Sequence, residues 1–214
     1  HYSSRRQRQM CIRDSRHAGL SQIIIDLKRD GAKVRPIKNM AGGEDFNEVV
    51  FEDVVVPKDR IVGEAGNGWA QVTSELAYER SGPERFLSAF RVFVELVRFC
   101  GPEPTEYQAT VIGRIASHIM TLRRMSISVA GMLESGKDVV VEAALVKELG
   151  NNFEKLLPEL ARVVGSDGFS DFSRDGDLFR RTFEDTMLLS PSFTLRGGTR
   201  EILRGVIARG LGLR

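Results

Sequence analysis

Two short segments of the sequence hold residue types that could bind anions or move protons. The sequence Arg-Gly-Gly-Thr at 196–199 precedes a helical pattern, so its glycines expose backbone N–H groups at the positive end of a helix. Such a terminus can bind a phosphate or another anionic group. Glu79 and Arg80 come shortly before Pro83, where a proline interrupts a helix and can open it onto a cavity. On residue type alone, the simpler interpretations are favoured: an ordinary helix start at 196–199 and an exposed glutamate beside an arginine at 79–80.

Other kinds of catalytic or metal site find no support in the sequence. His1, His17 and His118 have no histidine partner at metal-binding spacing, and no nucleophile elbow, phosphate-binding loop or dinucleotide fingerprint is present. Cys11 and Cys100 are too few for a disulfide framework or a four-thiolate metal site. We therefore expect no metal, and a reducing, cytoplasmic compartment.

The charge balance is local to the first residues. The chain has 214 residues and a formal charge of +2, but residues 1–15 hold four arginines against one aspartate. The remainder therefore carries a net charge of −1, which gives little support for nucleic-acid binding. An apolar content of 42% is ordinary for a globular protein, and no run of eighteen apolar residues predicts a membrane span.

The residue patterning predicts strands first and helices afterwards. Short β-branched runs at 23–27, 34–37 and 46–56 predict three or four strands, too few for a sheet with its own core. After residue 68 the apolar spacing becomes helical, over 69–97 with an interruption at Pro83, then 109–132, 139–164 and 199–211. We expect Thr199 to be the N-cap of the last helix and Glu201 to lie in its first turn. Short linkers make neighbouring helices antiparallel.

These patterns predict the fold class and its division. The class is α+β and mainly α, with a partial antiparallel β segment followed by an up-and-down four-helix bundle. We expect a truncated β domain over 16–64 and a helical-bundle domain over 65–214.

Four segments, taken in order, resemble the acyl-CoA dehydrogenase family. They are GLSQIIIDLKRDGAKVRPI, FNEVVFEDVVVPKDRIVGEAGNGW, CGPEPTEYQATVIGRIASHIM and, most specifically, GGTREILRGVIARGLGL at 197–213. The resemblance covers residues 18–214 and implies the end of the family's middle β domain and its C-terminal bundle. It does not include residues 1–15, in which RRQRQMCIRDS resembles translated sequencing-adapter read-through. We expect that head to be non-native or disordered; a transit peptide and a nucleic-acid-binding arm are the alternatives.

The resemblance implies an FAD-dependent enzyme that desaturates an acyl-CoA thioester between its α and β carbons. A carboxylate removes the α-proton in this family, and many members place that glutamate directly before the Gly-Thr of the C-terminal motif, where this chain has Gly197. Other members place it on the first bundle helix before an arginine, which corresponds to Glu79 followed by Arg80. We therefore expect Glu79 to be the base, with Glu84 as the next candidate.

The same resemblance implies binding residues and partners. Tyr78, Arg80 and Gly198 would line the acyl-CoA site. The positions that would contact FAD, in part the FAD of a neighbouring subunit, are Arg98, Gln108, Gly165, Gly168, Thr199 and Glu201. Expected partners are a second copy in a homodimer or homotetramer and an electron-transferring flavoprotein as acceptor. The alternative is a non-catalytic relative in which the bundle serves oligomerisation or binding.

The chain departs from the family pattern around the pyrophosphate contact. Val97 stands where an arginine is common, although Arg98 is adjacent, and Arg162 stands where a glutamine is common. The family's N-terminal helical domain and its early β segment have no counterpart in these 214 residues. We therefore expect the chain alone to bind FAD poorly.

Overall fold

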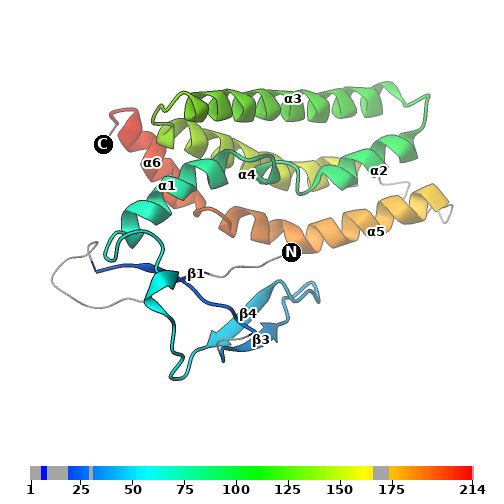
Figure 1. Ribbon diagram of the computed structural model, residues 1–214. Helices are drawn as coiled ribbons and strands as arrows, with labels where there is room; N and C mark the ends of the chain where they lie inside the picture. The colour runs from blue at the N-terminus through cyan, green and yellow to red at the C-terminus, as the bar shows by residue number, and fades with distance from the viewer. Residues whose placement is uncertain (1–5, 9–18, 29–30, 166–173, 214) are drawn as a thin grey trace. The chain divides into compact units, whose positions relative to one another are not determined.

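The computed structural model describes residues 6–8, 19–28, 31–165 and 174–213 (Figure 1). The chain divides into two compact units, His1–Glu75 and Leu76–Arg214, and each is described by itself. The boundary falls within helix α1, Gly68–Ser81.

The first unit contains two small antiparallel sheets. In one, β1 (Arg6–Arg8) pairs with β2 (Gln22–Ile24), and in the other β3 (Lys33–Ile37) pairs with β4 (Phe46–Val50). The described part of residues 1–15 is thus confined to β1, and the expectation of a non-native head stays a prediction.

A polar turn sets the register of the second sheet. The carboxamide oxygen of Asn39 accepts hydrogen bonds from the N–H groups of Ala41 and Gly43, both at 2.9 Å. Gly42 has a φ of 82°, which glycine adopts without a Cβ penalty. This turn aligns Ile37 opposite Phe46.

The predicted strand over 46–56 is wrong in its second half. Strand β4 ends at Val50, and Asp53 takes a φ of 49°, which turns the backbone out of a strand path. Continuous valines at 54–56 indicated a buried strand, but Val55 is exposed. With no paired strand beside this segment among the described residues, its β-branched residues do not extend the ladder.

The first predicted helix is broken at Pro83, more completely than a kink would require. Helix α1 ends at Ser81, Gly82 is extended with φ −65° and ψ 156°, and the short 3-10 helix η2 covers Pro83–Arg85. Helix α2 then runs over Phe90–Cys100. The proline has no N–H to continue the α-helical ladder, so the chain changes direction here.

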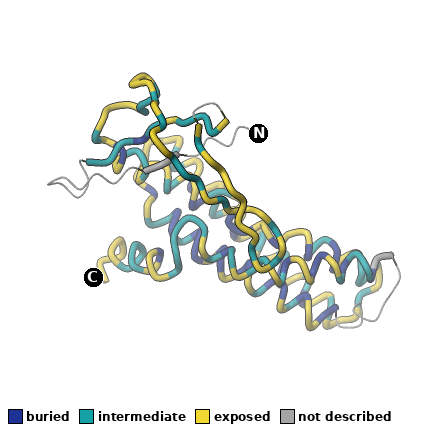
Figure 2. The backbone as a smooth tube through the Cα atoms, turned by 90° about the horizontal axis from the view of Figure 1, so that it is seen from below, coloured by how far each residue is buried: buried dark blue, intermediate teal, exposed yellow. Residues whose placement is uncertain are grey.

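The second unit is helical, and α4 lies at its centre. Helix α3 (Glu106–Glu134) starts with a Thr105–Gln108 capping box, and α4 spans Val140–Val164. Helix α5 (Arg174–Leu189), the 3-10 segment η4 (Ser190–Leu195) and α6 (Arg200–Gly210) complete it. Helix α4 packs against α2, α3, α5 and α6. Buried residues line the inward faces of these long helices (Figure 2).

The predicted fold class is confirmed, with one addition. Helix α5 was not predicted, because its buried face includes Thr182 and Thr186 and is surrounded by charges. Thr186 donates its hydroxyl to the carbonyl of Thr182 at 2.8 Å, so this buried hydroxyl finds its acceptor within the helix itself. The last helix begins at the predicted N-cap, Thr199. Within the described ranges, no helix combines the length and apolarity needed to cross a membrane.

We predict that Gly150→Ala destabilises the bundle although alanine favours helices. A Cβ at Gly150 would lie 2.3 Å from the backbone oxygen of Arg85, so α4 or η2 would have to shift. Overpacking of this kind costs about 1–3 kcal/mol, against about 1 kcal/mol gained in helix propensity. Chemical denaturation followed by circular dichroism measures the change.

Gly113→Ala is the matched control, because a Cβ at Gly113 in α3 meets nothing within 4 Å. It should raise the free energy of unfolding by about 0.5–1 kcal/mol. If the two substitutions had the same effect, the close approach of α4 to η2 would be refuted.

Candidate functional site

The two sequence positions at which the resemblance places a catalytic glutamate converge in the structure. A Cβ built on Gly197 would lie 3.3 Å from Oε1 of Glu79, although 118 positions separate the two residues in sequence. Gly197 and Gly198 have φ values of 66° and 108°, in the region that favours glycine. The turn before α6 therefore brings bare backbone against the end of α1.

Arg80 holds this turn in place. Its Nε donates to the carbonyl oxygen of Gly197 at 3.0 Å, and the residue is buried. Burial lowers the pKa of the Arg80 guanidinium, an effect that the neighbouring Glu79 carboxylate opposes. The predicted substrate residue Arg80 thus has an observed contact within the chain, with the Gly197 backbone.

Arg85 of η2 binds Glu79 of α1 across the break in the helix at Gly82 and Pro83. Its Nε donates to the Glu79 backbone oxygen at 2.6 Å, and its terminal nitrogen lies 2.9 Å from Oε1 of Glu79. The Arg85 side chain is 8% exposed, whereas that of Glu79 is 44% exposed. Glu84 lies farther from this guanidinium, at 3.6 Å. The Glu79 carboxylate is therefore oriented by a buried cation and still accessible to solvent.

A buried lysine lies behind Gly197. Lys147 of α4 is fully buried, and its Nζ donates to Oδ1 of Asn151 at 2.5 Å and to the carbonyl of Phe193 at 3.1 Å. Burial lowers the pKa of Lys147 to about 8, with Arg85 acting in the same direction.

A second buried charge of α4 is neutralised by the segment before α6. Glu154 is fully buried, and its carboxylate accepts from the Ser88 N–H at 2.9 Å and pairs with Arg196 at 3.3 Å. The Arg196 guanidinium also lies 4.9 Å from the centre of the Phe193 ring. These contacts join α4, the start of α2 and the turn into α6 in one polar network.

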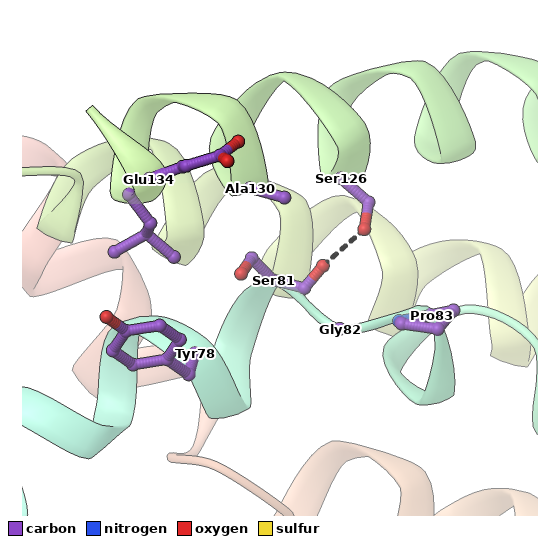
Figure 3. Close-up of a pocket in the computed structure, with 8 residues that line it drawn as sticks. Tyr78, Ser81, Gly82, Pro83, Ser126, Ala130 and Glu134 are labelled. Carbon is purple, nitrogen blue, oxygen red and sulfur yellow. Dashed lines mark hydrogen bonds between the residues drawn. The ribbon is translucent and has the colours of Figure 1, made fainter. Parts of the chain in front are cut away.

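The predicted substrate residue Tyr78 lines a different feature, a pocket of about 370 Å³ (Figure 3). Tyr78 and Ser81 border the pocket from α1, Ser126 and Glu134 from α3, and the Ser126 hydroxyl donates to the Ser81 carbonyl at 2.6 Å. Glu79 is not among the lining residues, because it is rotated by about 100° around the helix from Tyr78. Tyr78 and Glu79 therefore face different surroundings.

Three of the predicted FAD residues lie at the opposite end of the bundle from Glu79. Gly165 ends α4, and the helical rise puts it more than about 25 Å from Lys147. A Cβ there would lie 2.3 Å from the Phe179 ring, which stacks on Phe99 near the end of α2. Glycine is thus explained by packing alone at this position. The structure brings Gly165 to the end of the bundle at which α2 ends and α3 begins.

The other two residues at that end supply hydrogen-bond donors. Arg98 pairs with Glu95 at 2.9 Å but leaves its side chain 62% exposed. Gln108 accepts the Thr105 N–H in the capping box, so its amide N–H groups are not used in that contact. Both side chains could therefore bind an anionic or carbonyl group of a ligand. Gly168, the remaining predicted contact in this region, lies outside the described residues.

Thr199 and Glu201 lie at the Glu79 end of the bundle. The pKa of Glu201 is lowered, first by its own backbone N–H and then by the Thr199 hydroxyl, which both donate to its carboxylate. Gly198, predicted to line the substrate site, lies close to this helix start. A Cβ built on Gly198 would lie 3.5 Å from a terminal nitrogen of Arg80. The predicted cofactor residues are thus divided between the two ends of the bundle, and one chain does not surround a single ligand with all of them.

Sequence reasoning missed Arg85, Lys147 and Glu154 as parts of the site. A signal was available in α4, where Lys147, Asn151 and Glu154 follow the 4- and 3-residue spacing of one helix face. That polar stripe lies among buried apolar residues of α4, and burial of all three was the missing information. Within the described residues, no group of three or more His, Cys, Asp or Glu side chains could hold a metal ion.

Comparison with known proteins yields curated relatives about twice as long as this chain. Acyl-CoA dehydrogenase IpdE1 of Mycolicibacterium smegmatis is 30% identical over 205 residues, which cover 92% of this chain and 50% of the relative. The protein of that name in Mycobacterium tuberculosis is 31% identical over 203 residues, covering 92% of this chain and 52% of its own length. The chain therefore spans about half the length of these relatives.

Solved structures share the fold at lower identity. The Tcur3481-Tcur3483 steroid ACAD superposes with a TM-score of 0.80 at 20% identity, over 98% of this chain and 56% of its own. The ChsE4-ChsE5 complex from Mycobacterium tuberculosis gives a TM-score of 0.75 at 24% identity, over 99% of this chain and 57% of its own. Residues 66–212 match the family described as acyl-CoA dehydrogenase, C-terminal domain. Because that match covers most of the sequence, the chain belongs to the acyl-CoA dehydrogenase family and carries its C-terminal domain.

Proposed function

We propose that this chain is the C-terminal part of an FAD-dependent acyl-CoA dehydrogenase in which Glu79 removes the α-proton of an acyl-CoA thioester. The observation that carries this proposal is the 3.3 Å approach of Glu79 Oε1 to the Cβ position of Gly197. Position 197 has no carboxylate, but the Glu79 carboxylate of α1 lies beside it, which supports Glu79 as its substitute. A base supplied by either position would thus serve one reaction centre.

The surroundings of Glu79 suit a general base. The α-proton of a thioester is a weak acid, so the base must be held in hydrogen-bond reach and its carboxylate must be ionised before it acts. Arg85 fixes one carboxylate oxygen at 2.9 Å, and the other part of the side chain remains 44% exposed. Closure of a substrate over this exposed face would remove water from the carboxylate and from the proton that it takes up.

The turn before α6 offers donors for the thioester oxygen. Within the described part of the chain, the N–H groups of Gly197 and Gly198 donate to no backbone oxygen. Backbone N–H groups at a helix N-terminus can stabilise the enolate-like oxygen that develops as the α-proton leaves. Arg80, by binding the Gly197 carbonyl, keeps this turn beside Glu79.

FAD, when bound, would accept the hydride that leaves the β carbon. The residues that fit such a group are the exposed Arg98 guanidinium and the amide N–H groups of Gln108, which the capping box does not use, at one end of the bundle, and Thr199 at the other. Their separation fits a cofactor contacted by more than one copy of the chain, so we propose a homodimer or homotetramer. An electron-transferring flavoprotein is the proposed acceptor, in a reducing, cytoplasmic compartment. One more distant relative is a subunit of the caffeyl-CoA reductase-Etf complex of Acetobacterium woodii.

A non-catalytic role in oligomerisation or binding is the second candidate. The observation that favours it is the Glu79–Arg85 ion pair itself, because a carboxylate engaged by arginine can be a structural link. The two candidates differ in what loss of the Glu79 charge does to chemistry.

We predict that Glu79→Gln abolishes flavin reduction by acyl-CoA. The variant is made in the proposed full-length enzyme, of which this chain would be the C-terminal part. Glutamine keeps the size of the side chain but cannot take up the α-proton, so the rate should fall by more than about 100-fold. Anaerobic bleaching of the flavin across acyl-CoA chain lengths, with a steroid-type acyl-CoA included, measures it.

Glu84→Gln is the matched control, because Glu84 also lies beside Arg85 but at 3.6 Å. It should bleach at close to the wild-type rate. Wild-type bleaching by the Glu79 variant would remove Glu79 as the base and favour the non-catalytic role.

We also predict that the 214-residue chain alone binds FAD weakly. It spans about half of its relatives and contributes only a few donors to the cofactor, so most of the binding surface would come from elsewhere. Titration of the purified chain with FAD, followed by flavin fluorescence, should show no saturable quenching at micromolar concentrations. A yellow purified chain that acyl-CoA reduces would contradict this expectation.

A further inference from the structure

Lys147 is a charged residue placed directly behind the proposed reaction centre, where it is shielded from solvent. It is fully buried, and its Cε lies 3.7 Å from the Cβ position of Gly197. Its ammonium contacts the Asn151 carboxamide on its own helix and the carbonyl of Phe193 in η4. Lys147 therefore links the centre of the bundle to the segment that leads into the Gly197 turn.

We propose that Lys147 is a positioning residue for the Glu79 base, which acts by holding η4 so that Gly197 stays against the Glu79 carboxylate. The inference rests on the proposed function in that it takes Glu79 as the base. It adds a residue that touches neither substrate nor cofactor in this proposal and works through the backbone of the turn.

The desolvation penalty of the buried Lys147 ammonium supports a specific role for this residue. Burying an ammonium is unfavourable unless it is compensated, and an apolar side chain of the same size would pack here without that desolvation penalty. The two hydrogen-bond acceptors of Lys147 are both neutral. The hydrogen bond to the Phe193 carbonyl offsets part of the desolvation penalty of Lys147, and it also gives that carbonyl oxygen a donor.

Charged groups from several elements surround this ammonium. Arg85 of η2 and Arg196 after η4 disfavour its charge, whereas Glu154 of α4 and Glu79 of α1 favour it. Burial is the largest influence and lowers the pKa of Lys147 to about 8. Lys147 is thus coupled electrostatically to both the base and the arginine that orients it.

The turn is also held at its far side, so loss of Lys147 should loosen it without releasing it completely. Phe193 is buried, and Arg196 contacts both the Phe193 ring and Glu154. These contacts remain when Lys147 is replaced by methionine, which fills similar space but donates no hydrogen bond.

The first test compares Lys147→Met with Lys155→Met, an exposed lysine on the same helix. In hydrogen–deuterium exchange of the 214-residue chain, amides at 192–200 should exchange about tenfold faster in Lys147→Met, because one hydrogen bond to the turn is lost. Amides in α3 should keep their protection, and Lys155→Met should match the wild type throughout. Unchanged exchange at 192–200 in a folded Lys147→Met chain would overturn the proposal.

The second test separates an effect on the position of the Glu79 base from an effect on substrate binding. It uses the proposed full-length enzyme, of which this chain would be the C-terminal part. A displaced base should lower kcat by about 100-fold with KM within threefold of wild type, and should increase the α-deuterium isotope effect. If Glu79→Gln abolishes bleaching while Lys147→Met keeps wild-type kcat and isotope effect, the positioning role of Lys147 is refuted and the proposed function stands. If Glu79→Gln also keeps wild-type bleaching, the proposed function fails, and the exchange experiment still decides whether Lys147 orders the turn.

A third measurement needs only the wild-type chain, in case Lys147→Met does not fold. NMR of chain with ¹³C-labelled lysine should show one Cε resonance, assigned with Lys147→Arg, that titrates near pH 8 and has a nuclear Overhauser contact to the Gly197 α protons. A Lys147 resonance that lacks this contact would overturn the proposal.

Discussion

Burial of charged side chains on α4 is the constraint on which the site depends. Lys147 and Glu154 are both fully buried, and each must find compensation inside the protein. Lys147 obtains it from Asn151 and the Phe193 carbonyl, and Glu154 obtains it from Ser88 and Arg196. Because Ser88 lies before α2, and Phe193 and Arg196 lie before α6, satisfying the two charges fixes where both segments can lie.

Two glycines allow the close approaches that accompany these buried charges. Gly150 lets the backbone of η2 approach α4, and Gly197 lets the end of α1 approach the turn before α6. Arg85 in η2 can then reach Glu79, since the chain has turned at Gly82 and Pro83. Close backbone contact and buried charge are therefore parts of one arrangement, in which a carboxylate from α1 lies beside the position of the absent side chain at 197.

The division of the predicted ligand residues is informative for a chain that spans about half of its relatives. Glu79, Arg80, Gly198 and Thr199 gather at one end of the bundle, whereas Arg98, Gln108 and Gly165 lie near the other. A long helix such as α4 separates the two groups by a fixed distance, so no rearrangement of side chains can unite them. The bundle thus presents two separate surfaces, and the proposed enzyme would need more than this one chain to complete each site.

The sequence by itself determined the helical bundle, the break at Pro83 and the start of the last helix at Thr199, because periodicity and capping are local properties. It identified the family through the segment at 197–213, and it pointed to Glu79 only by way of that resemblance. It did not show α5, whose buried threonines resemble exposed polar residues, nor the end of β4 at Val50. Only the tertiary structure decided that Glu79 lies beside Gly197, that Arg85 and Lys147 lie against this pair, and that Glu154 binds Arg196 before the turn. Those contacts join residues up to 118 positions apart, and their formation depends on burial, which no local spacing of residue types can specify.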